Sequence, residues 1–164
     1  MFRDRISEVS EGEKMSKVVV GGTFNVLHKG HIKLLSDAVD IATLKGAMLM
    51  VGITSDELAQ RTRTVPVRPR KERMADVQDY IEKHVLRPHF GPTQYEIIRD
   101  VNYMPVMNND DTLVVSEETA MHAFEILADR GYGCAVHVID MVKDKDGNEI
   151  HSTKILEEIE NEIQ

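Results

Sequence analysis

Residues 21–31 of the chain read GGTFNVLHKGH. The stretch follows a short β-branched run at residues 17–21 (KVVVG) and precedes a helical pattern at residues 29–43. Two adjacent glycines between a strand and a helix let the backbone turn sharply and approach a ligand closely. A loop of this kind after a buried parallel strand predicts a ligand site at the edge of an α/β sheet.

Two histidines stand at the end of this stretch. His28 and His31 are three residues apart, so at a helix start they share one face. Gly30 lies between them and is expected to leave room for a phosphate or a base beside the helix. The helix N-terminus adds exposed N–H donors and a partial positive charge. Together these features predict a site for phosphate charge that develops during a reaction.

Two weaker interpretations of the histidine pair stay open. One is a half-formed metal site, although the neighbouring sequence offers neither a cysteine nor an obvious acidic third ligand. The other is a pair of ordinary surface histidines on a helix. The stretch also lacks the second and third glycines of a G-x-G-x-x-G loop, which argues against a nicotinamide dinucleotide.

The remainder of the chain alternates between strand and helix patterns. Further strands are predicted at residues 47–54, 95–99, 112–115 and 134–140. Helices are predicted at residues 70–85, 117–129 and 152–163, and another helix is predicted to start at residues 55–57. Apolar residues spaced by three and four mark the buried faces of the first two long helices, at Ile32, Leu35, Val39, Ala42 and at Met74, Val77, Ile81. Five strands separated by helices predict an α/β fold, a Rossmann-like doubly wound five-stranded parallel sheet.

Size and charge narrow the function. The 164 residues suit one domain, expected at residues 17–164 behind an N-terminal extension at residues 1–16, within which Met15 could be the natural start. The net charge of −8 argues against a general nucleic-acid binder. The sequence has neither an apolar run of the ~20 residues that span a membrane nor the pattern of a signal peptide. We therefore expect a cytoplasmic protein with a small phosphate ligand, and leave its oligomeric state open.

The lone cysteine, Cys134, is expected to be a small buried residue.

Two further segments are expected to reach the same site, because ligands of doubly wound sheets bind beyond the carboxyl ends of the strands. The loop after the second strand and the helix that follows carry a basic cluster, Arg61, Arg63, Arg68, Arg70, Lys71 and Arg73. The last predicted helix opens with hydroxyls and a positive charge that can receive phosphate, on Ser152, Thr153 and Lys154. The plainer alternatives are a solvated charged loop and an ordinary serine N-cap.

The helix at residues 117–129 opens differently. Ser116 is followed by two acids, Glu117 and Glu118, which suit the positive end of a helix but would repel a phosphate. The segment is therefore expected to contact a base, a ribose, a cation or a neighbouring subunit, or simply to cap the helix.

The stretch at residues 21–31 resembles the GTFDxxHxGH motif of the HxGH nucleotidyltransferases. Two other segments resemble the archaeal and eukaryotic-type phosphopantetheine adenylyltransferases: LVVSEET at residues 113–119 and DMVKDKDGNEIHSTKIL at residues 140–156. The likeness covers residues 17–160. It implies adenylyl transfer from ATP to 4′-phosphopantetheine, giving dephospho-coenzyme A and pyrophosphate, with Mg²⁺ carried mainly by ATP. The chain departs from the motifs at four positions, Asn25 for aspartate, His151 for serine, and Lys154 and Leu156 for arginines.

The resemblance also implies roles for individual residues. The two histidines would bind the ATP phosphates, Thr23 would contact the reacting phosphate, and either Arg61 or Arg63 would contact the acceptor phosphate. Catalysis is thus expected from Thr23, His28, His31 and Lys154. ATP is expected to contact Gly21, Gly22, Thr23, Phe24, His28, Gly30, His31, Ser116, Ser152, Thr153 and Lys154.

Two other functions stay open. One is the same chemistry on another acceptor, such as FMN, nicotinamide mononucleotide, or glycerol phosphate with CTP. The other is a non-catalytic protein that senses ATP or coenzyme A.

Overall fold

The computed structural model describes residues 15–84 and 91–140. Along this part of the chain the elements are β1 (Lys17–Gly22), α2 (Lys29–Lys45), β2 (Met48–Thr54), α3 (Asp56–Arg61), α4 (Arg70–His84), β3 (Thr93–Ile98), β4 (Thr112–Ser116), α5 (Glu117–Arg130) and β5 (Ala135–Ile139). The predicted helix at residues 152–163 lies outside the described residues, as do residues 1–14 of the predicted extension.

The described strands form one parallel sheet in the order β3-β2-β1-β4-β5. The chain winds outward from β1 through β2 to β3, then returns to place β4 on the other side of β1. The winding direction therefore reverses between β1 and β4, and the predicted doubly wound five-stranded fold is confirmed. In folds of this class the ligand crevice opens at this reversal, beyond the carboxyl ends of the strands.

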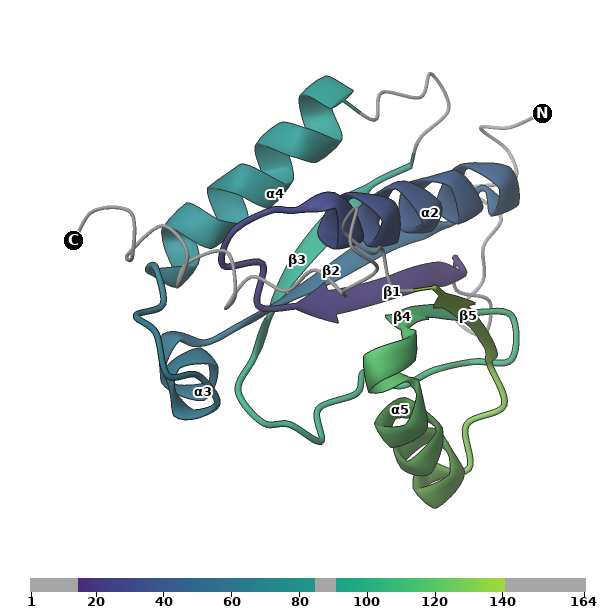
Figure 1. Cartoon of the computed structure of the whole chain (residues 1–164). Coiled ribbons are helices and arrows are strands. Elements are labelled where there is room, and N and C mark those ends of the chain that lie inside the picture. The colour runs from purple at the N-terminus through teal and green to yellow at the C-terminus, as the bar shows by residue number, and fades with distance from the viewer. Residues whose placement is uncertain (1–14, 85–90, 141–164) are drawn as a thin grey trace.

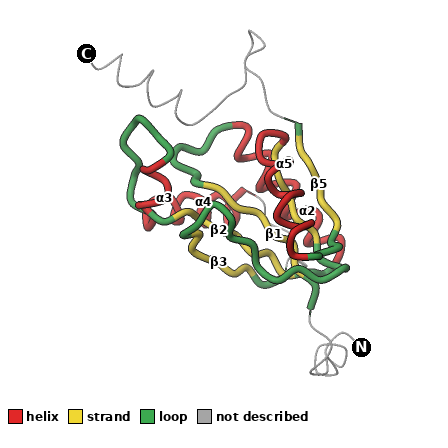
Figure 2. The backbone as a smooth tube through the Cα atoms, turned by 90° about the horizontal axis from the view of Figure 1, so that it is seen from below, coloured by secondary structure: helices red, strands yellow, loops and turns green. Residues whose placement is uncertain are grey.

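Helices cover both faces of the sheet (Figure 1). Alternate residues of β1 point to opposite faces, so that Val18 and Val20 join one buried cluster and Val19 joins the other. The first cluster packs under α2 and α4, and the second packs against α5 and the long loop at residues 99–111. Figure 2 shows the molecule from the side of α5, with this loop running beside the strands.

Predicted and observed bounds differ by one or two residues, most clearly at β3. The structure begins this strand at Thr93, whereas the apolar pattern predicted a start at residue 95. Thr93 and Gln94 are polar, and they belong to the strand because they pair with Leu49 and Met50 of β2. Backbone pairing therefore extends the strand beyond what side-chain pattern reveals.

One predicted core residue of α2 is wrong. Ile32 is 37% exposed, whereas the helix buries Leu34 and Ala38 beside the correctly predicted positions. The buried stripe thus lies further round the helix, toward Leu34, than the three-and-four spacing alone indicated. The predicted inner side of α4 is confirmed, since Val77 and Ile81 are buried and Met74 packs against them. Cys134 is only partly buried, and it packs against the cluster under α5.

Candidate active site

A cleft of about 640 Å³ opens at the carboxyl ends of β1 and β4. The end of β1 and the loop after it form one part of the wall, and the junction of β4 with α5 forms another. The end of α3, the loop after β3, and residues of β2, β3 and β5 also line the cleft. Among the predicted site residues, the cleft is lined by Gly21, Gly22, Thr23, Phe24, His28, Gly30, His31, Arg63 and Ser116.

His28 is the N-cap residue of α2. Its backbone is extended, and its Nδ1 accepts a hydrogen bond from the backbone N–H of Gly30 over 3.0 Å. A neutral imidazole that accepts at Nδ1 carries its hydrogen on Nε2. His28 therefore presents an N–H donor on the Nε2 side of its ring.

The structure corrects the reason for a glycine at position 30. A Cβ atom there would lie 2.9 Å from Cε1 of His28, too close for any real contact. The His28 ring therefore fills the space that a Cβ atom at position 30 would need, while Gly30 still lines the cleft. The Gly30 amide is also engaged by His28, so that it is not one of the exposed donors expected at the helix start.

His31 is fixed from two sides. Its Nδ1 lies 3.1 Å from the carbonyl oxygen of Val26, and a carbonyl only accepts, so Nδ1 carries a hydrogen. The ring of Phe24 meets the His31 ring edge-on at 5.2 Å. Both histidine rings are therefore held by the loop between β1 and α2, with the Nδ1 of each bonded to backbone.

The sharp turn of this loop falls on Phe24. Its φ of 52° is the one positive value for a non-glycine residue in the described ranges, whereas Gly21 and Gly22 lie inside β1. A bulky side chain rarely adopts this conformation, and full burial of the Phe24 ring holds it there. A Cβ atom on Gly22 would lie 3.2 Å from that ring, which explains the glycine. The prediction that the glycine pair makes the turn is wrong.

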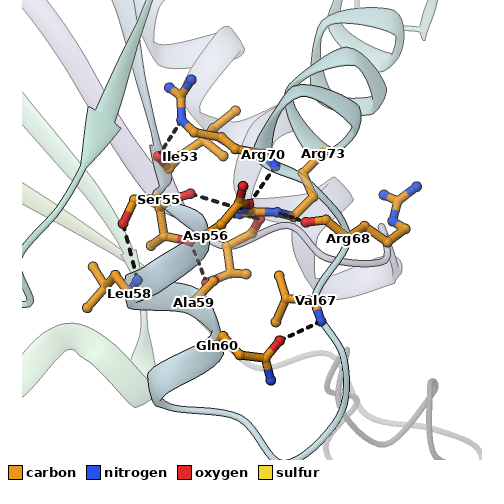
Figure 3. A network of polar contacts seen from close by, with 12 residues as sticks. Ile53, Ser55, Asp56, Leu58, Ala59, Gln60, Val67, Arg68, Arg70 and Arg73 are labelled. Carbon is orange, nitrogen blue, oxygen red and sulfur yellow. Dashed lines mark hydrogen bonds and ion pairs between the residues drawn. The ribbon is translucent and has the colours of Figure 1, made fainter.

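Arg73 lies below the cleft and is fully buried. Its guanidinium donates to the carbonyl oxygens of Thr23 (3.0 Å), Thr54 (3.0 Å) and Arg68 (2.7 Å), and to the hydroxyl of Thr54 (3.1 Å). The carboxylate of Asp56 accepts a fifth hydrogen bond at 2.8 Å, which also neutralises the charge (Figure 3). Arg73 therefore joins the ends of β1 and β2 to α3 and the loop before α4.

Arg68 and Arg70 also have structural contacts. The side chain of Arg70 donates to the carbonyl oxygens of Ile53 (3.0 Å) and Glu96 (2.8 Å). The Arg68 guanidinium donates to the carbonyl oxygen of Asn25 (2.8 Å) and forms an ion pair with Asp76. Part of the basic cluster predicted for phosphate binding therefore makes structural hydrogen bonds and ion pairs between the loops and their neighbouring elements.

Arg63 is the arginine of this cluster that lines the cleft, while the exposed Arg61 is not among the described lining residues. The Nη1 of Arg63 donates to the Ala59 carbonyl and to Thr62 Oγ1. Its Nε is buried and has no hydrogen-bond partner within the described part of the chain. Burial and the nearby charge of Arg73 lower the pKa of Arg63, and Glu118 acts in the opposite sense. The structure therefore distinguishes two arginines that the sequence left equivalent.

Asn25, where the resembled motif has aspartate, is fully buried beneath the arginine loop. Its Oδ1 accepts from the backbone N–H of Arg68 over 2.9 Å, and its Nδ2 donates to the carbonyl oxygen of Pro66 over 3.4 Å. The amide needs both its acceptor and its donor here, so the side chain connects the histidine loop to the arginine loop.

The opposite wall of the cleft carries polar side chains from α5. Ser116 is the N-cap residue of α5, yet its hydroxyl makes no bond to a helix amide and lies 3.3 Å from Thr119 Oγ1. Glu118 and His122 also line this wall. His122 was not singled out from the sequence, because a lone histidine in an amphipathic helix carries no distinctive pattern.

An apolar wall comes from the loop after β3, which the sequence predicted only as a loop. Val101, Tyr103, Met104 and Pro105 line the cleft there. The helix α5 holds this loop in place through two side chains. Arg130 donates to the carbonyl oxygens of Asn102 and Met104, and Nε2 of His122 lies 3.1 Å from the carbonyl oxygen of Val101. Apolar residues in a loop give no sequence sign of which cavity they face.

Three predicted site residues, Ser152, Thr153 and Lys154, lie outside the described residues. Within residues 15–84 and 91–140, no group of three or more histidine, cysteine, aspartate or glutamate residues is arranged to hold a metal ion. None of the helices in those ranges is both long and apolar enough to cross a membrane.

Comparison with known proteins places the chain in a family. Residues 19–158 match the model of the cytidylyltransferase-like family. The chain is 32% identical over 154 residues to the phosphopantetheine adenylyltransferase of Methanopyrus kandleri, with 90% of this chain and 92% of the relative covered. It is 35% identical over 148 residues to that of Pyrobaculum aerophilum, with 87% and 90% covered. The chain belongs to the phosphopantetheine adenylyltransferase family.

Solved structures support the fold of this phosphopantetheine adenylyltransferase family member. An Archaeoglobus fulgidus protein of unknown function superposes with a TM-score of 0.61 at 27% identity, covering 82% of this chain and 99% of that one. Pantoate-beta-alanine ligase from Francisella tularensis, solved with a β,γ-ATP compound and β-alanine, superposes with a TM-score of 0.55 at 14% identity, covering 99% and 74%. The second likeness concerns the fold alone.

Proposed function

We propose that the protein transfers the adenylyl group of ATP to 4′-phosphopantetheine, giving dephospho-coenzyme A and pyrophosphate. The observation that carries this proposal is the single cleft that gathers Thr23, the histidine pair and Arg63, in a chain of this family. ATP-dependent synthesis of this kind suits the cytoplasm.

In the proposed reaction an oxygen of the acceptor phosphate attacks the α-phosphate of ATP. A new P–O bond forms there, and the bond between the α-phosphate and the bridging oxygen to the β-phosphate breaks, so that pyrophosphate leaves. The attacking phosphate oxygen carries no proton at neutral pH, and no protein nucleophile is required. Catalysis therefore depends on positioning and on stabilising the charge of the transition state.

Several of the described cleft residues have a place in this scheme. The Nε2–H of His28 would donate to a phosphate oxygen of ATP, and His31, whose Nδ1–H is bonded to backbone, would donate from Nε2 in its doubly protonated form. Thr23 would align the reacting phosphates at the end of β1. Ser152, Thr153 and Lys154 are proposed to complete the triphosphate site from the last predicted helix, and Gly21, Gly22, Phe24, Gly30 and Ser116 to contact ATP.

The acceptor would lie between Arg63 and the apolar loop. The guanidinium of Arg63 offers a charge for the terminal phosphate of phosphopantetheine. In the loop after β3, Val101, Tyr103, Met104 and Pro105 offer a largely apolar surface for its arm. The names of the relatives favour phosphopantetheine over FMN or nicotinamide mononucleotide as the acceptor.

Magnesium would arrive with ATP as part of the substrate, because Mg²⁺ keeps most of its waters and binds largely through substrate phosphates. Glu96, Asp100, Glu118 and Asp140 line the cleft and supply carboxylates that could bind its waters. In this proposal Mg²⁺ and the four carboxylates act in substrate binding alone.

Pyrophosphate release tests the proposal. The purified chain is incubated with ATP, Mg²⁺ and, in separate reactions, 4′-phosphopantetheine, FMN and nicotinamide mononucleotide; glycerol phosphate is supplied with CTP. We expect release with phosphopantetheine alone. Release with another acceptor would reassign the substrate, and tight ATP binding without release from any acceptor would make the protein a nucleotide sensor.

A further inference from the structure

The five hydrogen bonds of Arg73 fix the direction of a hydrogen-bond chain beneath the cleft. A guanidinium has five N–H donors and no acceptor, and Arg73 uses all five on its neighbours. The Thr54 hydroxyl lies 3.1 Å from Nη1 of Arg73 and can only accept from it. Its own hydrogen is therefore available for a different partner.

That partner is Thr23. The hydroxyl of Thr54 donates to Oγ1 of Thr23 over 3.0 Å. An oxygen that already accepts this bond still has a hydrogen of its own to donate. Thr23 and Thr54 both line the cleft, whereas Arg73 behind them is fully buried. The Thr23 hydroxyl is thus set as a hydrogen-bond donor to a cleft ligand.

We propose that Thr54, held by Arg73, is a positioning residue that turns the Thr23 hydroxyl hydrogen toward the phosphate bound in the cleft. This hydrogen-bond chain begins at an N–H group of the Arg73 guanidinium, and it strengthens the donor at its far end because successive hydrogen bonds polarise one another. The role rests on the proposed function, since it assumes that Thr23 meets a phosphate group of ATP or of the acceptor.

Arg73 also fixes the backbone of Thr23 through a 3.0 Å hydrogen bond to its carbonyl oxygen. A purely structural role for this hydrogen-bond chain would therefore affect folding and the backbone position of Thr23. The proposed role acts through one hydroxyl hydrogen, and so it can be removed at Thr54 while Arg73 stays in place. The two roles are separated by a double-mutant cycle on Thr23 and Thr54.

The cycle compares the wild type with Thr54→Val, Thr23→Val and the double variant. Valine keeps the shape of threonine and removes the hydroxyl, and Thr54→Ser returns the hydroxyl. The matched control is Thr43→Val, because the Thr43 hydroxyl donates to the Val39 carbonyl oxygen in α2 and Thr43 is not among the described residues that line the cleft. Each variant is measured for kcat and KM with ATP and 4′-phosphopantetheine, for the Kd of ATP by calorimetry, and for its melting temperature.

We expect Thr54→Val to lower kcat about tenfold and Thr23→Val to lower it about 10²-fold. In the Thr23→Val background, adding Thr54→Val should change kcat less than about twofold, because the hydroxyl it orients is already gone. Thr54→Ser should recover most of the loss. Arg73→Lys, if it folds, should lower kcat about as much as Thr54→Val does. Combining the two substitutions should not multiply their losses in kcat.

Three results would overturn the positioning role. One is a Thr54→Val variant with unchanged turnover and unchanged ATP binding; another is losses that multiply in the double variant, which would mean that Thr54 contacts the ligand itself. The third is a loss that follows the melting temperature alone. If the wild type releases no pyrophosphate with phosphopantetheine, the proposed function fails, and the same cycle measured on the Kd of ATP decides the positioning role separately.

Discussion

The imidazole of His28 stacks on that of His31 with ring centroids 3.8 Å apart and planes inclined by 21°. The stacking holds the two rings as one unit, and backbone atoms of Gly30 and Val26 engage the Nδ1 of each. A phosphate in the cleft would therefore meet the Nε2 sides of both rings. The ring of Phe24, which packs edge-on against His31, further restrains the pair.

Replacing His31 should disable the transfer step. We expect His31→Ala to lower kcat by about 10²-fold, the usual cost of losing one donor to a developing charge. The melting temperature should change little, because the ring lies at the cleft surface. His137→Ala is the matched control, since His137 contacts Asp37 and neither residue is among the described residues that line the cleft. Near-normal turnover by His31→Ala would remove this histidine from the mechanism.

Substitutions of Arg63 and Arg61 should differ in their effect on the KM for the acceptor. Arg63→Ala should raise the KM for 4′-phosphopantetheine by about 10- to 100-fold, because a charged hydrogen bond to phosphate is lost. Arg61→Ala, two residues away and exposed, should change it less than about twofold. Steady-state kinetics at saturating ATP gives both values, and a larger effect from Arg61 would reverse the assignment.

Asp56 should contribute to stability far more than its exposed position suggests. One of its oxygens, Oδ1, accepts from the buried Arg73 guanidinium at 2.8 Å and from the backbone N–H of Arg70 at the start of α4, at 2.7 Å. Asp56→Ala would leave a buried charge unpaired and a helix end uncapped, which should cost about 2–4 kcal/mol. Urea denaturation measures this cost.

The neighbouring Glu57 provides the control for Asp56, because it is exposed and also lies in the first turn of α3. Glu57→Ala should change the free energy of unfolding by less than about 0.5 kcal/mol. Equal effects from the two substitutions would show that the Asp56 contacts add nothing to stability.

Asp111 should make the fold sensitive to acid. Burial alone would raise its pKa, but hydrogen bonds from the Lys17 ammonium and from the backbone N–H groups of Asn108 and Lys17 lower it below the ordinary 3.8. Because the folded-state pKa lies below the unfolded one, this stability is complete above pH 3.8 and is lost as the pH falls through the folded pKa.

Urea denaturation between pH 2 and pH 7 tests this linkage. Asp111→Asn should be less stable than the wild type at pH 7, by about 1–3 kcal/mol, and the gap should shrink as the pH falls below 3.8. The exposed neighbour Asp110 gives the control, Asp110→Asn. A gap that stays constant with pH would contradict the role of the carboxylate charge.

Much of the fold could be predicted because its evidence is local. The alternation of strand and helix patterns, the parallel sheet and the placing of the histidine loop at its edge all follow from periodicity and glycine content. The errors arise where tertiary contacts outweigh local pattern. Ile32 is exposed because the sheet meets α2 along a slightly different stripe, and the sharp turn lies at Phe24 because full burial of its ring holds an unfavourable φ.

The basic cluster shows the same limit within the site. Arg61, Arg63 and Arg73 carry identical side chains a few residues apart, and the sequence predicted one common role for them. In the structure Arg61 is exposed, Arg63 lines the cleft, and Arg73 is buried with five hydrogen bonds. The position of Arg73 depends on Thr23, Thr54 and Asp56, which lie outside its own helix.

The sequence by itself determined the class of fold, the family and the histidine pair, because these depend on residues close together along the chain. Tertiary structure alone decided which arginine reaches the cleft, which wall is apolar, and that Arg73 lies behind Thr54 and Thr23. The physical reason is that the burial and hydrogen bonding of a side chain are set by the elements that surround it, and these come from distant parts of the chain.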